Sequence, residues 1–462
     1  MSVHPATRTS PRFSPRPVAV LAVALLIAAG SHAVALVGGV AVGGPGAAAP
    51  VPAEVPLPGA VGEAQPLERI DRAIATWTGN LERDAADFIA ATNLAELYLA
   101  RARITGLSTD YGRSLSAVEQ ALDTDPSLVA ARALNAQILF ASHDFEGAEA
   151  AASALLVDHP GLPQALATLG DARLERGDYD GAAAAYGELA DAFESPAITA
   201  RQARLASVTG SLDDARRLAA AATAAAVADG ALPAADRAWY HVLEGALAFQ
   251  AGDLVAAERA YRQALDAWSG SAPAWAGLGR VLAGGGSVDE AIAAYERAVA
   301  IVPQPDSLAA LGDLLAASGR HAEAETRYAQ VRAIGAIEAE AGLHNRSLVL
   351  FLANHGEAPA RAVEMAAAEL AGRTDVYGWD AYAWALYAAG RFDDADAAMT
   401  MARVHGTQDA QLDFHAGMIA AALGRTEDAT RQLRAALDRN PGFDILQAAR
   451  ARETLAQLEA GQ

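Results

Sequence analysis

The stretch APAWAGLGRVLAGGGSVDEAIAAYERAVAIVP, residues 272–303, holds two alanine-rich runs separated by Gly284-Gly285-Gly286-Ser287. A glycine-rich loop that leads into a helix can bind phosphate, because its bare backbone N–H groups approach an anion closely. Glycine also allows a tight turn between two helices, because it adopts positive φ without strain. The first interpretation favours an enzyme, and the second favours a protein that binds other proteins.

Gly286 belongs to a series of glycines that recurs along the chain every 33 to 42 residues. The members are Gly177, Gly210, Gly252, Gly286, Gly319, Gly356, Gly390 and Gly424. Alanine stands five residues after seven of these eight glycines. Asp289 and Glu290 follow Gly286 and place negative charge where a phosphate would bind. The series therefore predicts a turn between paired helices at each member, and not a phosphate loop.

Other positions of the period have readable roles. The alanine column predicts a close crossing of the two helices of a pair, since a small side chain allows close approach. Nine residues after the glycine, Tyr186, Tyr261 and Tyr295 are expected to fill the gap between one pair and the next. Proline closes several units, as at Pro303, where it would stop the second helix. Helical spacing of apolar residues continues from Glu68 onwards, without alternating strand patterns.

The unit at residues 272–303 resembles the tetratricopeptide repeat, a helix–turn–helix motif of 34 residues. The matching positions are Trp275, Leu278, Gly279, Gly286, Ala291, Tyr295, Ala298 and Pro303. The unit departs from the family pattern at Leu282, where the family has tyrosine. Residues 163–195 and 410–443 hold further units that follow the pattern well.

This resemblance implies an all-α fold, a right-handed superhelical α-solenoid of about ten tetratricopeptide-like helix–turn–helix repeats over residues 90–443. A lead-in helix over residues 67–89 is expected to precede the repeats. A helix over residues 444–462 with a polar outer face is expected to cap the other end.

Residues 1–43 are predicted to be an export signal or an N-terminal membrane anchor. Arg8, Arg12 and Arg16 precede a long apolar run, an order that is typical of export signals. Cleavage after Ala35 fits the small residues there, but residues 18–42 are also long enough to span a bilayer uncleaved. Both alternatives place the bulk of the chain outside the cytoplasm, secreted or anchored. Residues 44–66, rich in proline, alanine and glycine, are expected to form a semi-extended linker.

Composition excludes several functions. The chain has no lysine and no cysteine, so it lacks a Walker lysine, a Schiff-base lysine, thiolate nucleophiles and cysteine zinc sites. Its formal net charge of −21 argues against nucleic acid as a partner. No catalytic motif occurs, and we predict neither enzymatic activity nor a cofactor or metal. The pairs His143-Asp144 and Asp158-His159 fall at predicted turns, where such residues usually cap helices.

The resemblance also implies where a partner would bind, because first helices of tetratricopeptide repeats line a concave groove that holds peptides. The predicted groove residues are Tyr377, Asp380, Trp384, Tyr387, Phe414, His415 and Met418, with a second group at Trp239, Arg204 and Arg280. Aromatic side chains and arginine are good recognition anchors. The alternatives are that the aromatic residues pack between repeats and that the arginines pair internally.

Taken together, these patterns predict a non-enzymatic extracytoplasmic protein that binds a protein or peptide in its groove, as a scaffold or assembly factor of the cell envelope. The alternative is a receptor for a small ligand or peptide that uses the aromatic C-terminal repeats.

Overall fold

The computed structural model describes residues 66–340 and 346–460, and it is helical throughout, without strands in these two ranges. The helices are α1 Pro66–Arg83, α2 Phe88–Thr105, α3 Ser108–Thr124, α4 Val129–Ala141, α5 Phe145–Asp158, α6 Pro163–Glu175, α7 Tyr179–Ala192, α8 Pro196–Val208, α9 Leu212–Ala228, α10 Ala234–Gln250, α11 Leu254–Ala267, α12 Ala272–Gly284, α13 Val288–Ile301, α14 Pro305–Ala317, α15 His321–Glu340, α16 Arg346–His355, α17 Pro359–Leu370, α18 Val376–Ala388, α19 Phe392–Ala402, α20 Ala410–Ala422, α21 Thr426–Arg439 and α22 Gln447–Ala460.

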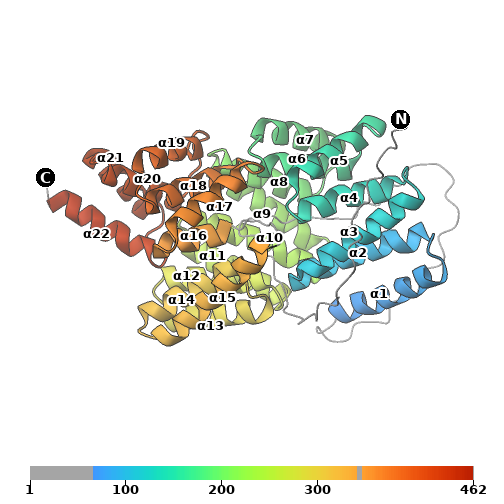
Figure 1. Ribbon diagram of the computed structural model, residues 1–462, viewed down its shortest axis with the longest axis horizontal. Coiled ribbons are helices and arrows are strands. Elements are labelled where there is room, and N and C mark those ends of the chain that lie inside the picture. Colours follow the sequence, from blue (N-terminus) through green and yellow to red (C-terminus); the bar gives the residue numbers. More distant parts are fainter. Residues whose placement is uncertain (1–65, 341–345, 461–462) are drawn as a thin grey trace, which may run out of the picture.

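The helices form ten consecutive hairpins, from α2/α3 to α20/α21, with α1 before them and α22 after them. The predicted α-solenoid of about ten helical pairs is therefore confirmed. The first pair begins at Phe88, just inside the segment that the sequence assigns to the lead-in helix. Figure 1 shows the N-terminal helices at one end of the molecule and α22 at the other.

All eight glycines of the series have positive φ, between 65° and 84°, as the turn prediction requires. In the run that contains Gly286, α12 ends at Gly284 and α13 begins at Val288. Gly286 has a φ of 84°, a conformation that costs other residues free energy. The run is therefore the turn between two paired helices.

The tyrosine column makes contacts within a helical pair as well as between pairs. The ring of Tyr186 in α7 lies against Gly170 in α6, and the ring of Tyr295 in α13 lies against Gly279 in α12. Both contacts lie within one helical pair, and Tyr295 also belongs to a buried cluster with Leu311 and Leu314 of the following pair, where we expected this column to pack. Tyr261 makes both kinds of contact. A first-helix glycine leaves a hollow that the ring of the second helix fills, which explains the position of both residues.

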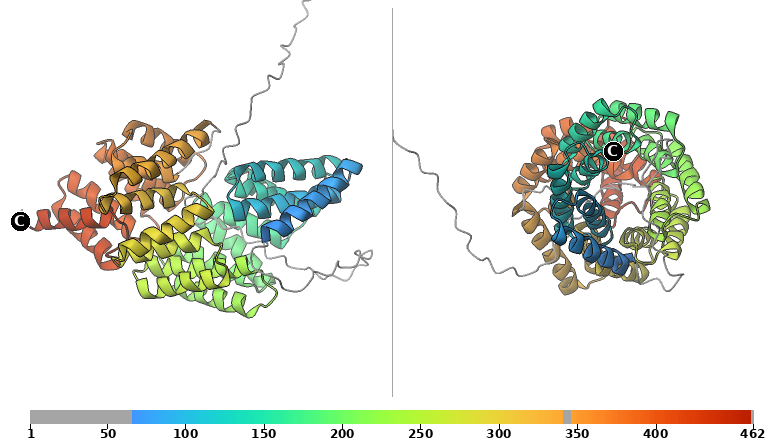
Figure 2. Two further views of the ribbon diagram at one scale, coloured as in Figure 1. Left: turned by 90° about the horizontal axis from the view of Figure 1, so that it is seen from below. Right: turned by 90° about the vertical axis from the view of Figure 1, so that its right-hand side faces the viewer.

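The pairs stack into a coil whose inner side is made by the first helices. First helices of consecutive pairs contact one another, as α10 contacts α12 and α16 contacts α18. Second helices of consecutive pairs show no comparable contact in the described part of the chain, so they lie on the wider, outer side. Viewed end-on, the helices form a ring (Figure 2).

Successive turns of the coil touch each other. The turn between α6 and α7 meets the segment before α18, and the Thr374 hydroxyl there donates to the Arg176 carbonyl, 198 residues away. One helical pair further along the chain, the Gln408 amide donates to the Gly210 carbonyl at 2.7 Å. At the next step, the Asn440 amide donates to the Phe249 carbonyl at 2.8 Å. We call this line of contacts, between residues 175–252 and residues 373–440, the seam.

The predicted export signal or anchor and all but the last residue of the predicted linker lie outside the described residues. Among the helices that are described, none is both long enough and apolar enough to cross a membrane.

Candidate partner-binding surface on the inner face

The predicted aromatic groove residues form a compact stack around Trp384 in α18. The Trp384 ring is stacked on His415 at a centroid distance of 4.1 Å and on Tyr387 at 4.6 Å. Phe414 and His415 have no exposed surface, and Trp384 is 1% exposed. Met418 is also buried. These side chains are therefore packed between neighbouring first helices.

A polar network fixes this stack. His415 Nδ1 lies 2.7 Å from the buried Asp380 carboxylate, and the Gln447 amide nitrogen lies 3.2 Å from His415 Nε2. Because an amide nitrogen can only donate, His415 accepts at Nε2 and carries its proton at Nδ1, toward Asp380. The side chains of Gln447 and Trp384 both donate to Asn354 Oδ1, at 2.8 Å and 2.7 Å. The network ties α16, α18, α20 and α22 together.

These positions correct the expectation of an open aromatic groove. Asp380, Trp384, Phe414, His415 and Met418 offer almost no surface to a partner, and the packing alternative describes them. The physical reason is the tight coil, which brings α16, α18 and α20 side by side and covers positions that a wider coil would leave open. Sequence alone gave no signal for Asn354 and Gln447, which complete the network.

Two tyrosines of the predicted groove are half-buried. Tyr387 accepts a hydrogen bond from Arg450 at 3.0 Å, and the guanidinium of Arg450 also lies over the Tyr387 ring. The Tyr377 hydroxyl donates to Asp409 at 3.2 Å. Burial, followed by the charge of Asp409, raises the pKa of Tyr377 well above its usual value, so this hydroxyl stays protonated.

Two members of the second predicted group have internal partners. Arg204 pairs with Glu175 at 2.8 Å, and its side chain is 11% exposed. The internal-pairing alternative therefore describes Arg204. Trp239 is half-buried and packs edge-on against Tyr240, with the ring centroids 5.1 Å apart.

Arg280 differs, because it is exposed although it lies on a first helix. Its guanidinium lies 5.7 Å from the ring centroid of Phe249 in α10 and is hydrogen-bonded to Tyr295 in α13. It also interacts electrostatically with Asp306 in α14 and with Asp444, which precedes α22. Asp444 belongs to the second turn of the coil, so Arg280 marks a place where both turns contribute charged groups to the inner side.

Sequence reasoning did not find Arg103 and Asp236, which form a comparable group nearer the N-terminus. Arg103 in α2 is exposed and interacts with the charges of Asp236 in α10, Glu96 in α2 and Arg201 in α8. These helices belong to pairs that are far apart along the chain, and only the curvature of the coil brings them together. We call Arg103, Asp236, Arg280, Asp306 and Asp444 the inner-face charges.

The surrounding coil changes the acidity of these carboxylates. The Asp306 side chain is exposed, yet the protein around it displaces bulk water and raises its pKa. The same loss of hydration raises the pKa of Asp236, where the nearby Arg103 opposes it. It also raises the pKa of Asp444, which accepts backbone hydrogen bonds from Leu446 and Gln447.

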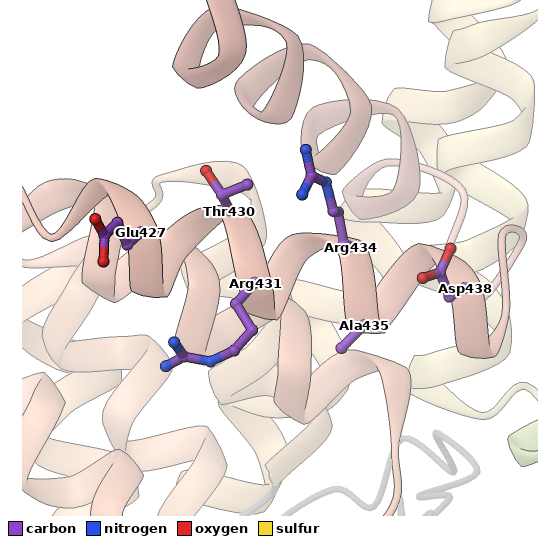
Figure 3. Close-up of a pocket in the computed structure, with 6 residues that line it drawn as sticks. All are labelled: Glu427, Thr430, Arg431, Arg434, Ala435 and Asp438. Carbon is purple, nitrogen blue, oxygen red and sulfur yellow. The ribbon is translucent and has the colours of Figure 1, made fainter. Parts of the chain in front are cut away.

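Two open hollows lie elsewhere on the described part of the chain. One of about 460 Å³ runs along α21 (Figure 3), where Thr430 and Arg434 point to the same side of the helix. Its two arginines are already paired, Arg431 with Asp428 and Arg434 with Glu459 at 2.8 Å. Another hollow of about 270 Å³ lies between α5, α6 and α7. Neither contains an arrangement of groups that points to a particular ligand.

Of the two histidine–aspartate pairs at turns, one caps a helix through a side chain, as expected. The Asp144 side chain accepts a hydrogen bond from the Gly147 backbone at 2.8 Å and caps α5. At the second pair, His159 is the residue that caps the C-terminus of α5, and it does so through its backbone N–H, which donates to the Leu155 carbonyl. Within the described residues, no three histidine or carboxylate side chains converge as a metal site would require.

The helical pairs, the glycine turns and the inner first helices together define a class, the helical-repeat solenoids. A family model of the tetratricopeptide repeat matches residues 134–197 and 242–305. The chain therefore contains tetratricopeptide repeats, a kind of repeat that mediates protein interactions. No curated protein matches the chain significantly.

Several solved structures are similar to this chain at low sequence identity. A tetratricopeptide repeat protein from Parabacteroides merdae is 14% identical, with a TM-score of 0.40, and the match covers 51% of this chain and 88% of that one. Yeast Tom70 is 12% identical, with a TM-score of 0.35, and the match covers 86% and 93%. PilW, a type IV pilus biogenesis factor, is 19% identical, with a TM-score of 0.38, and the match covers 45% and 93%.

Proposed function

We propose that this protein is a non-enzymatic binding protein that holds an extended protein segment against the inner face of its coil. The observation that carries the proposal is the convergence there of charged side chains that are exposed or half-buried. Arg280 and Asp306 come from neighbouring pairs, and Arg103 and Asp236 come from distant ones. A repeat protein of this family presents such a continuous curved surface to its partners.

The partner is a segment that carries charged side chains. Arginine binds carboxylates through two parallel hydrogen bonds, so Arg280 and Arg103 suit acidic side chains of a partner. The carboxylates of Asp236, Asp306 and Asp444 suit basic side chains. An extended segment that lies along the curved inner face from α2 to α14 can reach both the arginines and the carboxylates.

The proposed site of action is outside the cytoplasm, where the protein serves as a scaffold or assembly factor of the cell envelope. The basic-then-apolar order of residues 8–29 supports export. Fractionation of native cells and sequencing of the mature N-terminus test this part. A mature chain that starts at Leu36 indicates a cleaved signal, an intact N-terminus in the membrane fraction indicates an anchor, and a protein found in the cytoplasm contradicts export.

Charge reversal tests the binding surface. Arg103→Glu combined with Arg280→Glu changes the inner face. Arg259→Glu combined with Arg297→Glu, on the exposed sides of the second helices α11 and α13, is the matched control. Partners are captured from native cells by crosslinking and quantified for each variant. We expect the inner pair of changes to abolish capture of a specific partner that the control retains, and equal capture by both variants would contradict the proposal.

A further inference from the structure

One contact between consecutive pairs is made by a histidine whose two ring nitrogens both face oxygen acceptors. His355 is the last residue of α16. Its Nδ1 lies 2.8 Å from the Phe351 carbonyl oxygen in the same helix, and its Nε2 lies 2.9 Å from Asp313 Oδ1 in α14. A carbonyl and an ionised carboxylate can only accept, so both ring nitrogens donate. Since only the imidazolium has two N–H groups, this is the geometry of a charged histidine.

The contact joins three helices. The Tyr328 hydroxyl in α15 donates to the same oxygen of Asp313, at 2.8 Å. The His355 ring also lies against the Tyr328 ring, with the centroids 4.9 Å apart. The side chains of His355 and Asp313 are 16% and 11% exposed. We call Asp313, Tyr328 and His355 the histidine joint, because they connect the α14/α15 pair to the first helix of the next pair.

The other charged groups near α16 come from its neighbours. Glu357 lies just after α16, and Arg332 in α15 donates to it twice, at 2.6 Å and 2.8 Å. The helices α17 and α18 bring their charged groups to the other end of α16, where Arg346 pairs with Glu369 and Asp375. Burial alone would lower the pKa of His355, but the hydrogen bond to Asp313 and the charge of that carboxylate outweigh it and raise the pKa.

The pair α6/α7 carries the same arrangement with a permanent cation. Asp171 in α6 accepts a hydrogen bond from Tyr186 in α7 at 2.7 Å. These two residues are 15 positions apart, as are Asp313 and Tyr328. Arg201, in α8 of the next pair, donates to both oxygens of Asp171, at 2.9 Å each. We call this group the arginine joint.

The two joints differ in their cation. Arginine is always charged in proteins, whereas histidine loses its charge near neutral pH. The same carboxylate and tyrosine are therefore bound to a permanent charge in one joint and to a titratable charge in the other.

We propose that the histidine joint is pH-dependent, so that it holds α16 against the α14/α15 pair while His355 is charged and weakens when His355 loses its proton. A neutral imidazole has one N–H, so it gives up one of its two hydrogen bonds together with the charge that faces Asp313. The arginine joint does not change over the same pH range, because Arg201 keeps its charge.

The histidine joint also borders the inner-face charges. Asp313 interacts electrostatically with Asp444 and with Tyr295, which is hydrogen-bonded to Arg280. When His355 loses its proton, the charge of Asp313 is no longer balanced, and this part of the inner face becomes more negative. An effect on partner binding rests on the proposed function, whereas the joint itself does not.

The protonation of His355 in the unmodified protein tests the joint directly. Long-range ¹H–¹⁵N spectra of protein labelled at histidine distinguish the imidazolium from both neutral forms, and the spectrum of His355→Gln identifies the signal. We expect the pKa of His355 to lie above the usual value of about 6.5. Asp313→Asn removes the carboxylate, so the same signal should then titrate at lower pH than in the parent. A His355 that titrates at or below the usual value, or that does not respond to Asp313→Asn, would overturn the proposal.

Thermal unfolding tests whether the proton strengthens the joint. Because the pKa of His355 is raised in the folded state, its contribution to stability is fully present below about pH 6.5 and is lost as the pH rises through the folded value. Glutamine has an uncharged amide that can donate near the place of Nε2, so His355→Gln resembles the neutral form. We expect this variant to melt about 2 °C below the parent at pH 6, and the difference to close as the pH rises to 9.

Arg201→Gln in the arginine joint is the matched control. It should lower the melting temperature by the same amount at pH 6 and at pH 9, because arginine is charged at both. If the deficit of His355→Gln were equally independent of pH, His355 would have a structural role only and the proposal would fail. If either variant does not fold, the titration of His355 with and without Asp313→Asn decides.

These measurements need no partner, so they separate the joint from the binding function. A histidine joint that does not respond to pH leaves the proposed binding surface unaffected. Inner-face variants that still capture the partner contradict that surface and leave the joint unaffected.

Discussion

Glu175 and Arg373 form a buried ion pair although 198 residues separate them in the chain. Glu175 ends α6 in the first turn of the coil, and Arg373 lies between α17 and α18 in the second. Burial alone would raise the pKa of Glu175, but Arg373 and Arg204 outweigh it and lower that pKa. The carboxylate is therefore charged at neutral pH and holds the two turns together.

Removal of one partner should be costly here. Arg373→Ala leaves Glu175 buried with less compensation, and we expect a loss of about 3–5 kcal/mol of unfolding free energy. Arg391→Ala, which removes the exposed pair with Asp394, is the control and should cost at most about 1 kcal/mol. Chemical denaturation monitored by circular dichroism measures both. Equal losses for the two variants would show that the buried pair does not stabilise the coil.

The Tyr179 hydroxyl should contribute through a single hydrogen bond. Tyr179→Phe leaves the buried Val376 N–H without its acceptor, and we expect destabilisation by about 1–3 kcal/mol. Tyr382→Phe, at a half-buried ring in α18, should stay within about 0.5 kcal/mol of the parent. A neutral Tyr179→Phe in thermal unfolding would indicate that water takes the place of the hydroxyl.

Two glycines of one helical pair should respond in opposite directions to the same change. Gly170→Ala in α6 forces a methyl group into the ring of Tyr186, and we expect a loss of about 1–3 kcal/mol. Gly187→Ala in α7 has open space around it, so the better helix propensity of alanine should stabilise the protein by about 0.5–1 kcal/mol. The melting temperatures of both variants check this, and a stabilised Gly170→Ala would contradict the packing described above.

The turn after α4 should make stability depend on pH. Burial, together with the nearby Arg373, lowers the pKa of His143 to about 4. The unfolded chain binds this proton at higher pH than the folded chain does, so stability is lost as the pH falls from about 6.5 toward 4. Glu175 and Arg346 are the other charged groups that act on this ring.

His143→Asn removes this titration while it keeps a residue suited to the positive φ of 65° at that position. We expect the difference in melting temperature between parent and variant to change across this pH window and to be constant above it. A difference that does not depend on pH would mean that the imidazole titrates alike in both states.

Sequence predicted the hairpins because their determinants are local. Gly286, Ala291 and Tyr295 stand within a dozen residues of one another, and each acts on the turn or crossing beside it. The seam could not be predicted in this way. It depends on small rotations between pairs that accumulate over six pairs before Arg373 reaches Glu175.

The inner face was predicted only in part, because its exposure depends on how distant pairs are arranged. Helical position correctly assigned Trp384 and Arg280 to first helices, but position does not tell how tightly the coil winds. Tight winding buried Trp384 between its neighbours and left Arg280 exposed beside Asp444 of the next turn. The inner-face charges Arg103 and Asp236 became visible only when distant pairs faced each other.

A distance measurement across the seam tests the closed coil itself. The chain has no cysteine, so Asp180→Cys and Gly372→Cys introduce two unique sites for spin labels. Asp180 is exposed in α7, and the space around Gly372 is open. Double electron–electron resonance on this protein should give a narrow distribution at short distance, because the two turns touch. Five pairs of helices, α8/α9 to α16/α17, separate these sites along the solenoid with helices about 10 Å apart, so a broad distribution at several tens of ångströms would show that the turns do not meet.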